Sequence, residues 1–133
     1  MKKIEHIGIA VQDLKKATDL FSKIFEKESY KSEVIDSEGV VTNFFKIGES
    51  KIELIASIDD NSAIDKYLKK STQGMHHIAF YVDDIYYEIQ RLKQLGIRCL
   101  NENPKEGADN KLICFLHPHD TSNVLIELCQ EIN

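Results

Sequence analysis

The chain has 133 residues, enough to bury a hydrophobic core as one domain. Its 42% hydrophobic and 29% charged residues are typical of globular proteins, and no apolar run approaches the roughly 20 residues that cross a bilayer. The net charge is -5 and the lysines are scattered among acidic residues, so we expect neither a nucleic acid nor a membrane as a partner.

A strand pattern begins at the start of the chain and covers residues 4–11, IEHIGIAV. No signal or transit peptide precedes it, which predicts a cytoplasmic protein. Asp13 then offers a helix N-cap, and apolar residues recur at three- and four-residue intervals after it: Leu14, Ala17, Leu20, Phe21 and Ile24. Three shorter strands are predicted at about 28–35, 40–47 and 51–56.

A helix over about 62–70 leads to a second strand, residues 75–82, whose sequence MHHIAFYV has the shape of the first. The Asp83-Asp84 pair predicts another helix start, and Gly96 its end. Its predicted inner face is Ile85, Ile89, Leu92 and Leu95. Strands are expected again at about 97–100, 111–116 and 123–129, with a polar loop over 101–110.

The chain therefore repeats a βαβββ pattern. We expect an α+β fold in which two such modules, about 1–58 and 73–133, follow each other in a single domain covering 1–133. The helix over 62–70 joins them, and no low-complexity linker separates them.

Three cysteines, Cys99, Cys114 and Cys129, lie in apolar strand-like runs and show no CxxC spacing. Their odd number and spacing indicate buried thiols in a reducing compartment, not a disulfide framework or a cysteine zinc site.

Four polar residues share one face of the predicted strands. Side chains alternate along a strand, so if the apolar residues of each module pack under its helix, the residues between them point the other way. His6 and His77 do so in the two opening strands, and Glu53 and Glu127 in the two closing strands. Each module thus supplies one imidazole and one carboxylate.

A carboxylate within an apolar strand is costly to bury, and two facing carboxylates repel each other, unless a cation lies between them. The four residues predict one divalent metal ion, such as Co, Mn, Ni or Fe, with Zn as another choice. The competing interpretation is that both histidines are hydrogen-bonded core residues and both glutamates pair with lysines at strand edges. The duplication of the set favours the metal.

With these residues identified, the chain resembles the methylmalonyl-CoA epimerases of the vicinal oxygen chelate (glyoxalase-like) superfamily over practically its whole length. The segments that carry the resemblance are HIGIAVQDL from His6, KIELI at 51–55, DDNSAIDKYLKK, GMHHIAFYVDDI from Gly74, and CFLHPHDTSNVLIELCQ from Cys114.

The resemblance implies that the two modules form a curled mixed sheet around the metal, with His6, His77 and Glu127 as ligands. Glu53 stands where family members carry Gln or Glu. The implied reaction interconverts the C2 epimers of methylmalonyl-CoA through a metal-stabilised thioester enolate. The implied partners are an acyl-CoA substrate and a second copy in a homodimer.

The sequence departs from the family at the proton-transfer base. Some epimerases carry a Glu where this chain has Thr42, and a Thr hydroxyl does not act as a base near neutral pH. The remaining candidates are, in order, Glu127 and Glu53, then Lys111, then His117. For Lys111 a solvated charge at a loop end competes with a catalytic role, and for His117 a turn position before Pro118 does.

Two other functions stay open. A lactoylglutathione lyase would have the same set of ligands, although the FLHPHDTSNVLIEL ending favours the epimerase. A non-catalytic small-molecule binding protein of the same fold has no need of four convergent polar groups.

Overall fold

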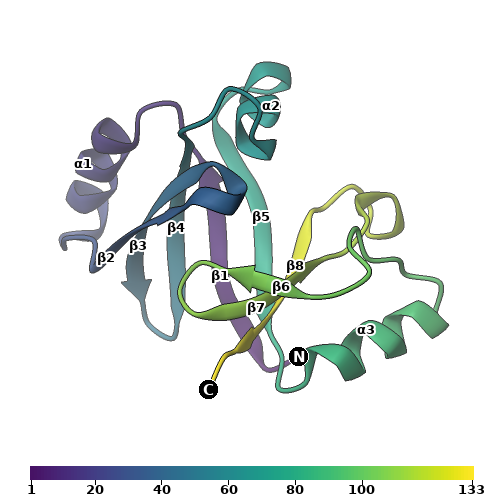
Figure 1. Ribbon diagram of the computed structural model, residues 1–133. Helices are drawn as coiled ribbons and strands as arrows, with labels where there is room; N and C mark the ends of the chain where they lie inside the picture. The colour runs from purple at the N-terminus through teal and green to yellow at the C-terminus, as the bar shows by residue number, and fades with distance from the viewer. The chain divides into compact units, whose positions relative to one another are not determined.

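The computed structural model describes residues 1–133 and has eight β-strands and three α-helices, which confirms the predicted α+β class (Figure 1). The chain divides into two compact units, one made of Ile7–His76 and the other of Met1–His6 with His77–Asn133. The strands β1 (Lys3–Ala10) and β5 (Gly74–Tyr81) each contribute residues to both units. No helix is long and apolar enough to cross a membrane.

The unit Ile7–His76 contains the helices α1 (Leu14–Phe25) and α2 (Ala63–Lys70). Its strands are β2 (Lys31–Ile35), β3 (Val40–Ile47) and β4 (Ser50–Ser57), and a short 3-10 turn, Asp36–Glu38, joins β2 to β3. The strand order is β2-β3-β4-β1, and β3 pairs with β2 and β4 in antiparallel fashion.

Helix α1 starts where the sequence predicts, because the Asp13 side chain accepts a hydrogen bond from Lys16 N at 3.0 Å. Figure 1 shows the helix on one side of the strands β2, β3 and β4. Its inner face is Leu14, Ala17, Phe21 and Phe25, which pack against a core that includes Phe45 and Leu54.

The prediction was wrong for two residues of this helix, Leu20 and Ile24, which are 54% and 59% exposed. At 3.6 residues per turn they lie about 100° and 60° around the helix from Phe21. The face of the helix that packs against the core is narrower than the set of apolar residues in the sequence. Phe25 lies on this face, in place of Leu20 and Ile24.

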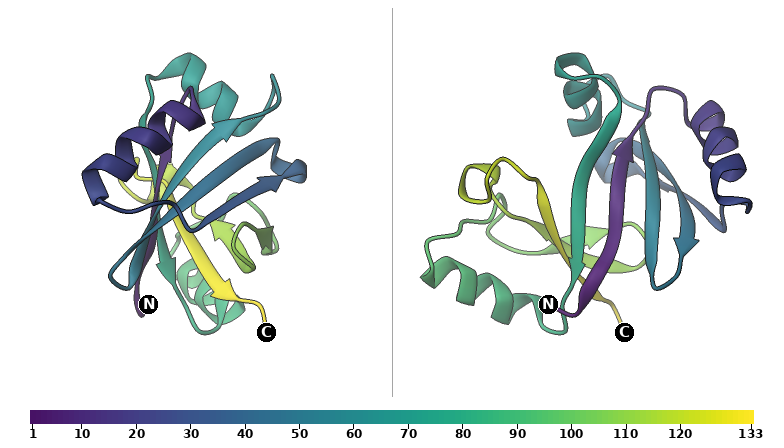
Figure 2. Two further views of the ribbon diagram at one scale, coloured as in Figure 1. Left: turned by 90° about the vertical axis from the view of Figure 1, so that its left-hand side faces the viewer. Right: turned by 180° about the vertical axis from the view of Figure 1, so that it is seen from behind.

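The other unit contains α3 (Ile85–Gln94) and the strands β6 (Lys105–Gly107), β7 (Lys111–Phe115) and β8 (Ile126–Glu131). Its strand order is β1-β5-β8-β7-β6. Strand β5 is parallel to β8, whereas β7 is antiparallel to β8 and to β6, so the strands form a mixed sheet. The right-hand view of Figure 2 shows β5, in teal, between β1 in purple and β8 in yellow.

Strand positions in this unit differ from the prediction, and β8 begins at Ile126 instead of at about residue 123. The expected strand 97–100 forms only an isolated bridge between Cys99 and Leu116. The third strand of the module is β6, inside the expected loop 101–110. The reversal between β6 and β7 uses positive φ angles at Asp109 and Asn110, 59° and 55°, a local conformation that hydrophobic periodicity does not reveal.

Helix α3 covers the core of this unit. Asp84 accepts a hydrogen bond from Tyr87 N at 3.1 Å and begins the helix, as predicted. The buried residues of its inner face pack against Cys114, Leu116 and Leu128. They are Ile85, Ile89 and Leu92. Leu95, predicted to join them, is 65% exposed because the helix ends at Gln94.

None of the three cysteines forms a disulfide. Cys114 and Cys129 are buried and Cys99 is half-buried, as expected for structural thiols. Burial, together with the neighbouring Cys99 thiol, raises the pKa of Cys114 to about 12. Cys114 is therefore a poor nucleophile in the folded protein.

Candidate metal centre

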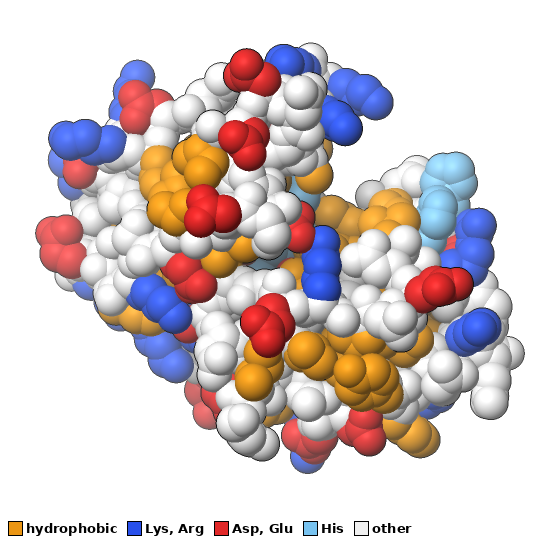
Figure 3. Space-filling model, in the orientation of Figure 1, with side chains coloured by type: hydrophobic (Ala, Val, Ile, Leu, Met, Phe, Trp, Pro, Cys, Tyr) orange, Lys and Arg blue, Asp and Glu red, His pale blue; other side chains and the backbone are white.

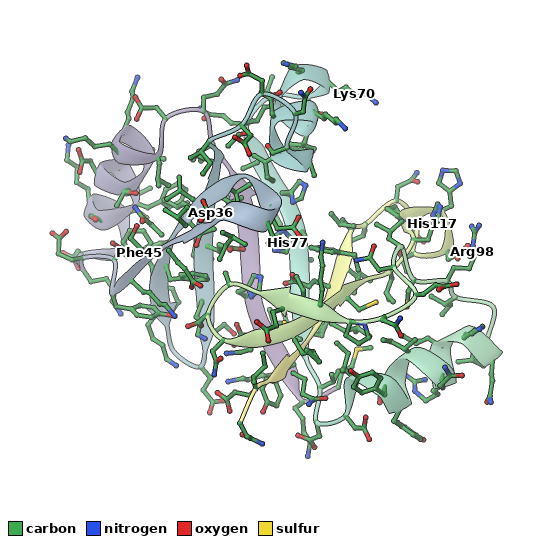
Figure 4. All side chains as sticks on the ribbon, in the orientation of Figure 1. Asp36, Phe45, Lys70, His77, Arg98 and His117 are labelled. Carbon is green, nitrogen blue, oxygen red and sulfur yellow. The ribbon has the colours of Figure 1, made fainter.

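Three buried side chains of the unit Met1–His6 with His77–Asn133 meet at one point. His6 comes from β1, His77 from β5 and Glu127 from the second position of β8. His6 Nε2 lies 3.0 Å from His77 Nε2 and 2.9 Å from Glu127 Oε1, and His77 Nε2 lies 3.8 Å from Glu127 Oε1. Figure 4 labels His77, which lies on strand β5.

Strand alternation places these groups as the sequence predicts. Leu128 packs under α3, so its neighbour Glu127 points to the opposite face. Glu127 stands beside Ala79 in the parallel register of β5 and β8, and opposite Phe115 in the antiparallel register of β7 and β8. The small Ala79 leaves room next to the carboxylate.

The geometry fits a divalent ion. The three ligand atoms lie within 4.8 Å of one another. Two ligands at about 2.1 Å from an ion and at right angles to each other are about 3 Å apart, close to the two shorter separations. Two imidazoles and one carboxylate on one side of an ion leave other positions for water or substrate, an arrangement that suits iron, cobalt, manganese, nickel or zinc.

Burial favours the same conclusion. His6, His77 and Glu127 are 7%, 5% and 5% exposed. A carboxylate with so little access to water is costly unless it is paired, and a cation offsets that cost. The predicted alternative of glutamates at exposed strand edges paired with lysines is therefore wrong for Glu127.

Glu53, the fourth predicted ligand, lies in β4 of the unit Ile7–His76 and is 5% exposed. It stands opposite Phe44 in the register of β3 and β4. Its neighbour Leu54 packs in the core under α1, so Glu53 points away from that helix, as predicted. Its participation in the metal site stays a prediction.

Thr42 shares this face of β3 and β4, because it stands opposite Ile55, two residues after Glu53. It is 1% exposed, and its hydroxyl oxygen Oγ1 is buried without a hydrogen-bond partner. The position where some related enzymes carry a carboxylate therefore holds a buried, uncharged group in this protein.

Lys111 is buried, so the interpretation of a solvated charge at a loop end is wrong. Its Nζ donates to the Asp109 carbonyl oxygen at 2.9 Å and lies 4.0 Å from Glu131 Oε1. Lys111 and Phe115 are the two ends of β7, about 13 Å apart at roughly 3.3 Å per residue. Because Phe115 stands opposite Glu127, the Lys111 backbone lies well away from the metal ligands.

His117 caps the short turn Pro118–Asp120, and its Nδ1 accepts a hydrogen bond from His119 N at 3.3 Å. Figure 4 labels it close to Arg98, and pale-blue histidine atoms are visible at the surface there in Figure 3. Hydrogen bonds from Arg98 lower the pKa of Asp120 to about 2. These contacts fit the predicted turn position of His117.

Sequence reasoning missed Glu5. It is 2% exposed, and its Oε1 lies 3.1 Å from His6 Nδ1, the ring nitrogen that does not face the other ligands. Strand alternation argued against it, because adjacent residues point to opposite faces. The only available signal was a carboxylate directly before the histidine in an apolar strand.

Comparison with known proteins shows the family to which this chain belongs. Residues 5–115 match the Glyoxalase/Bleomycin resistance protein/Dioxygenase superfamily. The chain is 37% identical over 129 residues to the mitochondrial methylmalonyl-CoA epimerase of Homo sapiens, covering 96% of this chain and 73% of that protein. It is 35% identical over 130 residues to the ethylmalonyl-CoA/methylmalonyl-CoA epimerase of Cereibacter sphaeroides, covering 96% and 97%.

The fold is similar to that of a Streptomyces coelicolor methylmalonyl-CoA epimerase variant in complex with 2-nitronate-propionyl-CoA. The TM-score is 0.94 at 33% sequence identity, and the match covers 98% of this chain and 95% of that one.

Proposed function

Because this chain belongs to the Glyoxalase/Bleomycin resistance protein/Dioxygenase superfamily, we propose that its metal site serves an epimerase that interconverts the C2 epimers of methylmalonyl-CoA. The observation that carries the proposal is the buried convergence of His6, His77 and Glu127 in a chain that matches epimerases over nearly its full length.

The reaction requires a proton to leave C2 and another to arrive from the opposite face. C2 lies between a thioester carbonyl and a carboxylate, so removal of its proton places negative charge on an enolate oxygen. A bound divalent ion supplies Lewis-acid stabilisation of such charge. We propose His6, His77 and Glu127 as its ligands, with Glu53 as a fourth.

The protein binds the ion through the unprotonated Nε2 atoms of His6 and His77 and the negative charge of the Glu127 carboxylate. His6 and His77 both direct Nε2 towards the Glu127 carboxylate, so these nitrogens must carry lone pairs when the ion binds. All three groups are buried, and the lower dielectric constant around buried groups strengthens electrostatic interactions in the site.

For proton transfer we propose Glu53 before Glu127, and Lys111 after both. Glu127 Oε1 lies against two imidazole nitrogens, at 2.9 and 3.8 Å, which makes this carboxylate less available to take a proton. Lys111 Nζ is bound at the end of β7. Glu53 is also a buried carboxylate, and it points away from helix α1.

Deuterium incorporation tests the function. One epimer of methylmalonyl-CoA is incubated with the purified protein in deuterated water, with and without a chelator. We expect deuterium at C2, reduced by the chelator and by His77→Ala, but not by Glu88→Gln on helix α3. No incorporation by the metal-loaded wild type would contradict the proposal. Turnover of the hemithioacetal of methylglyoxal and glutathione would instead support the lyase.

We further propose that the protein acts in the cytoplasm as a homodimer that binds an acyl-CoA. The acyl-CoA is supported by the names of the related enzymes and by the bound analogue in the Streptomyces coelicolor structure. The dimer rests on the family resemblance. Sedimentation equilibrium measures the mass in solution, and a mass of 15.3 kDa at all concentrations would contradict the dimer.

A further inference from the structure

Glu5 is a buried carboxylate that the proposed reaction does not use. Its Oε1 contacts His6 Nδ1 at 3.1 Å, and only 2% of its surface is exposed. The other nitrogen of the same ring, Nε2, faces His77 and Glu127 at 3.0 and 2.9 Å. The imidazole of His6 therefore has a carboxylate on one side and the metal ligands on the other.

A carboxylate can only accept a hydrogen bond, whereas a neutral imidazole carries its single hydrogen on one of its two nitrogens. Contact with Glu5 thus places the hydrogen of His6 on Nδ1 and leaves the lone pair on Nε2. We propose that Glu5 is a positioning residue that holds His6 in the tautomer and ring orientation that bind a divalent ion. This inference rests on the proposed metal site.

The local geometry supports a specific role for this contact. Glu5 and His6 are neighbours in β1, and neighbouring side chains of a regular strand point to opposite faces. The three rotatable bonds of Glu5 bring its carboxylate to the ring of its own neighbour. Ordering a long side chain and burying its charge are both unfavourable, so the contact needs a compensating gain. Carboxylates that accept from a metal-binding histidine provide such a gain by raising metal affinity.

The alternative role is purely structural, in which Glu5 stabilises the fold by pairing with His6. The two roles differ in one measurable quantity. If the role is structural, replacement of Glu5 lowers the stability of the metal-free protein and leaves the metal affinity of the folded protein unchanged. If Glu5 is a positioning residue, its replacement lowers the metal affinity of the folded protein.

Cobalt binding separates the two roles. The dissociation constant of Co²⁺ is measured by competition with a chromophoric chelator for the wild type, Glu5→Gln, Glu5→Ala and Glu88→Gln. Glu5→Gln keeps the length and one acceptor, but its amide can also donate and so allows the wrong tautomer of His6. Glu88→Gln is a matched control, because Glu88 is a partly buried carboxylate that pairs with Arg91 on α3.

We expect about 10-fold weaker cobalt binding by Glu5→Gln and between about 10- and 100-fold weaker binding by Glu5→Ala, with no change for Glu88→Gln. Circular dichroism of the metal-free proteins identifies the folded variants, and Glu5→Gln alone suffices if Glu5→Ala does not fold. Cobalt affinity within about twofold of wild type in a folded Glu5 variant would overturn the inference.

The deuterium assay of the wild type distinguishes a failure of the positioning role from a failure of the proposed epimerase reaction. Weaker cobalt binding by the Glu5 variants, in a protein that exchanges no deuterium into methylmalonyl-CoA, would support the positioning role and contradict the epimerase. Normal exchange by the wild type with unchanged cobalt affinity of the variants would support the epimerase and contradict the positioning role.

Discussion

Replacement of Glu127 by Gln tests the metal centre most directly. The substitution keeps the size of the side chain but removes the single negative charge among the three converging groups. Glu127 Oε1 lies 2.9 Å from His6 Nε2 and 3.8 Å from His77 Nε2, so the new amide stays in place next to both rings. The change therefore isolates the contribution of charge to ion binding.

The expected magnitude follows from the role of the residue. Loss of a group that merely supports a ligand weakens metal binding by about 10- to 100-fold, so loss of a charged ligand is expected to cost at least about 100-fold, or about 2.8 kcal/mol. The metal-free protein behaves differently. Removal of a buried charge also removes the cost of keeping that charge away from water, so the metal-free variant is expected to fold.

The assay combines metal content after dialysis with thermal unfolding with and without cobalt. Wild type is expected to gain stability from the ion and Glu127→Gln to gain little. Glu131→Gln is the control, because Glu131 lies on the same strand and its side chain is 59% exposed. Full metal content and an unchanged cobalt-induced shift in Glu127→Gln would refute the assignment of this ligand.

Three further predictions concern the fold. Leu128→Ala, which empties a fully buried position under α3, should lower the unfolding free energy in urea by about 2–5 kcal/mol, and a loss below about 1 kcal/mol would contradict the core assignment. Asp84→Ala removes the N-cap bond to Tyr87 and should cost about 1 kcal/mol in the same titration, whereas an unchanged midpoint would argue against the cap. Asp120→Asn should remove a stabilisation that depends on pH. Because Arg98 lowers the pKa of Asp120 to about 2, this stabilisation is complete above about pH 4 and is lost as the pH falls through about 2, so the difference in Tm from wild type should shrink over that range. A constant difference would contradict the ion pair.

Much of the fold could be predicted from local chemistry. Asp13 and Asp84 are visible as helix starts because their side chains accept hydrogen bonds from backbone N–H groups three residues later. Strand β3 was predicted at its observed bounds, Val40–Ile47, because a run rich in β-branched and aromatic residues, with a glycine on each side, is typical of a strand. Strand β6 was missed because Lys105 and Glu106 are polar and a tight turn at Asp109 creates the strand.

The sequence by itself determined which faces His6, His77 and Glu127 occupy, since alternation along a strand is a local property of the backbone. Only the tertiary structure decided that the ligand atoms of these three groups come within 4.8 Å of one another, because that depends on the pairing and register of strands far apart in the chain. It also placed Glu5 against His6 Nδ1, which no alternation rule predicts, because rotation about the side-chain bonds of one glutamate brings it there.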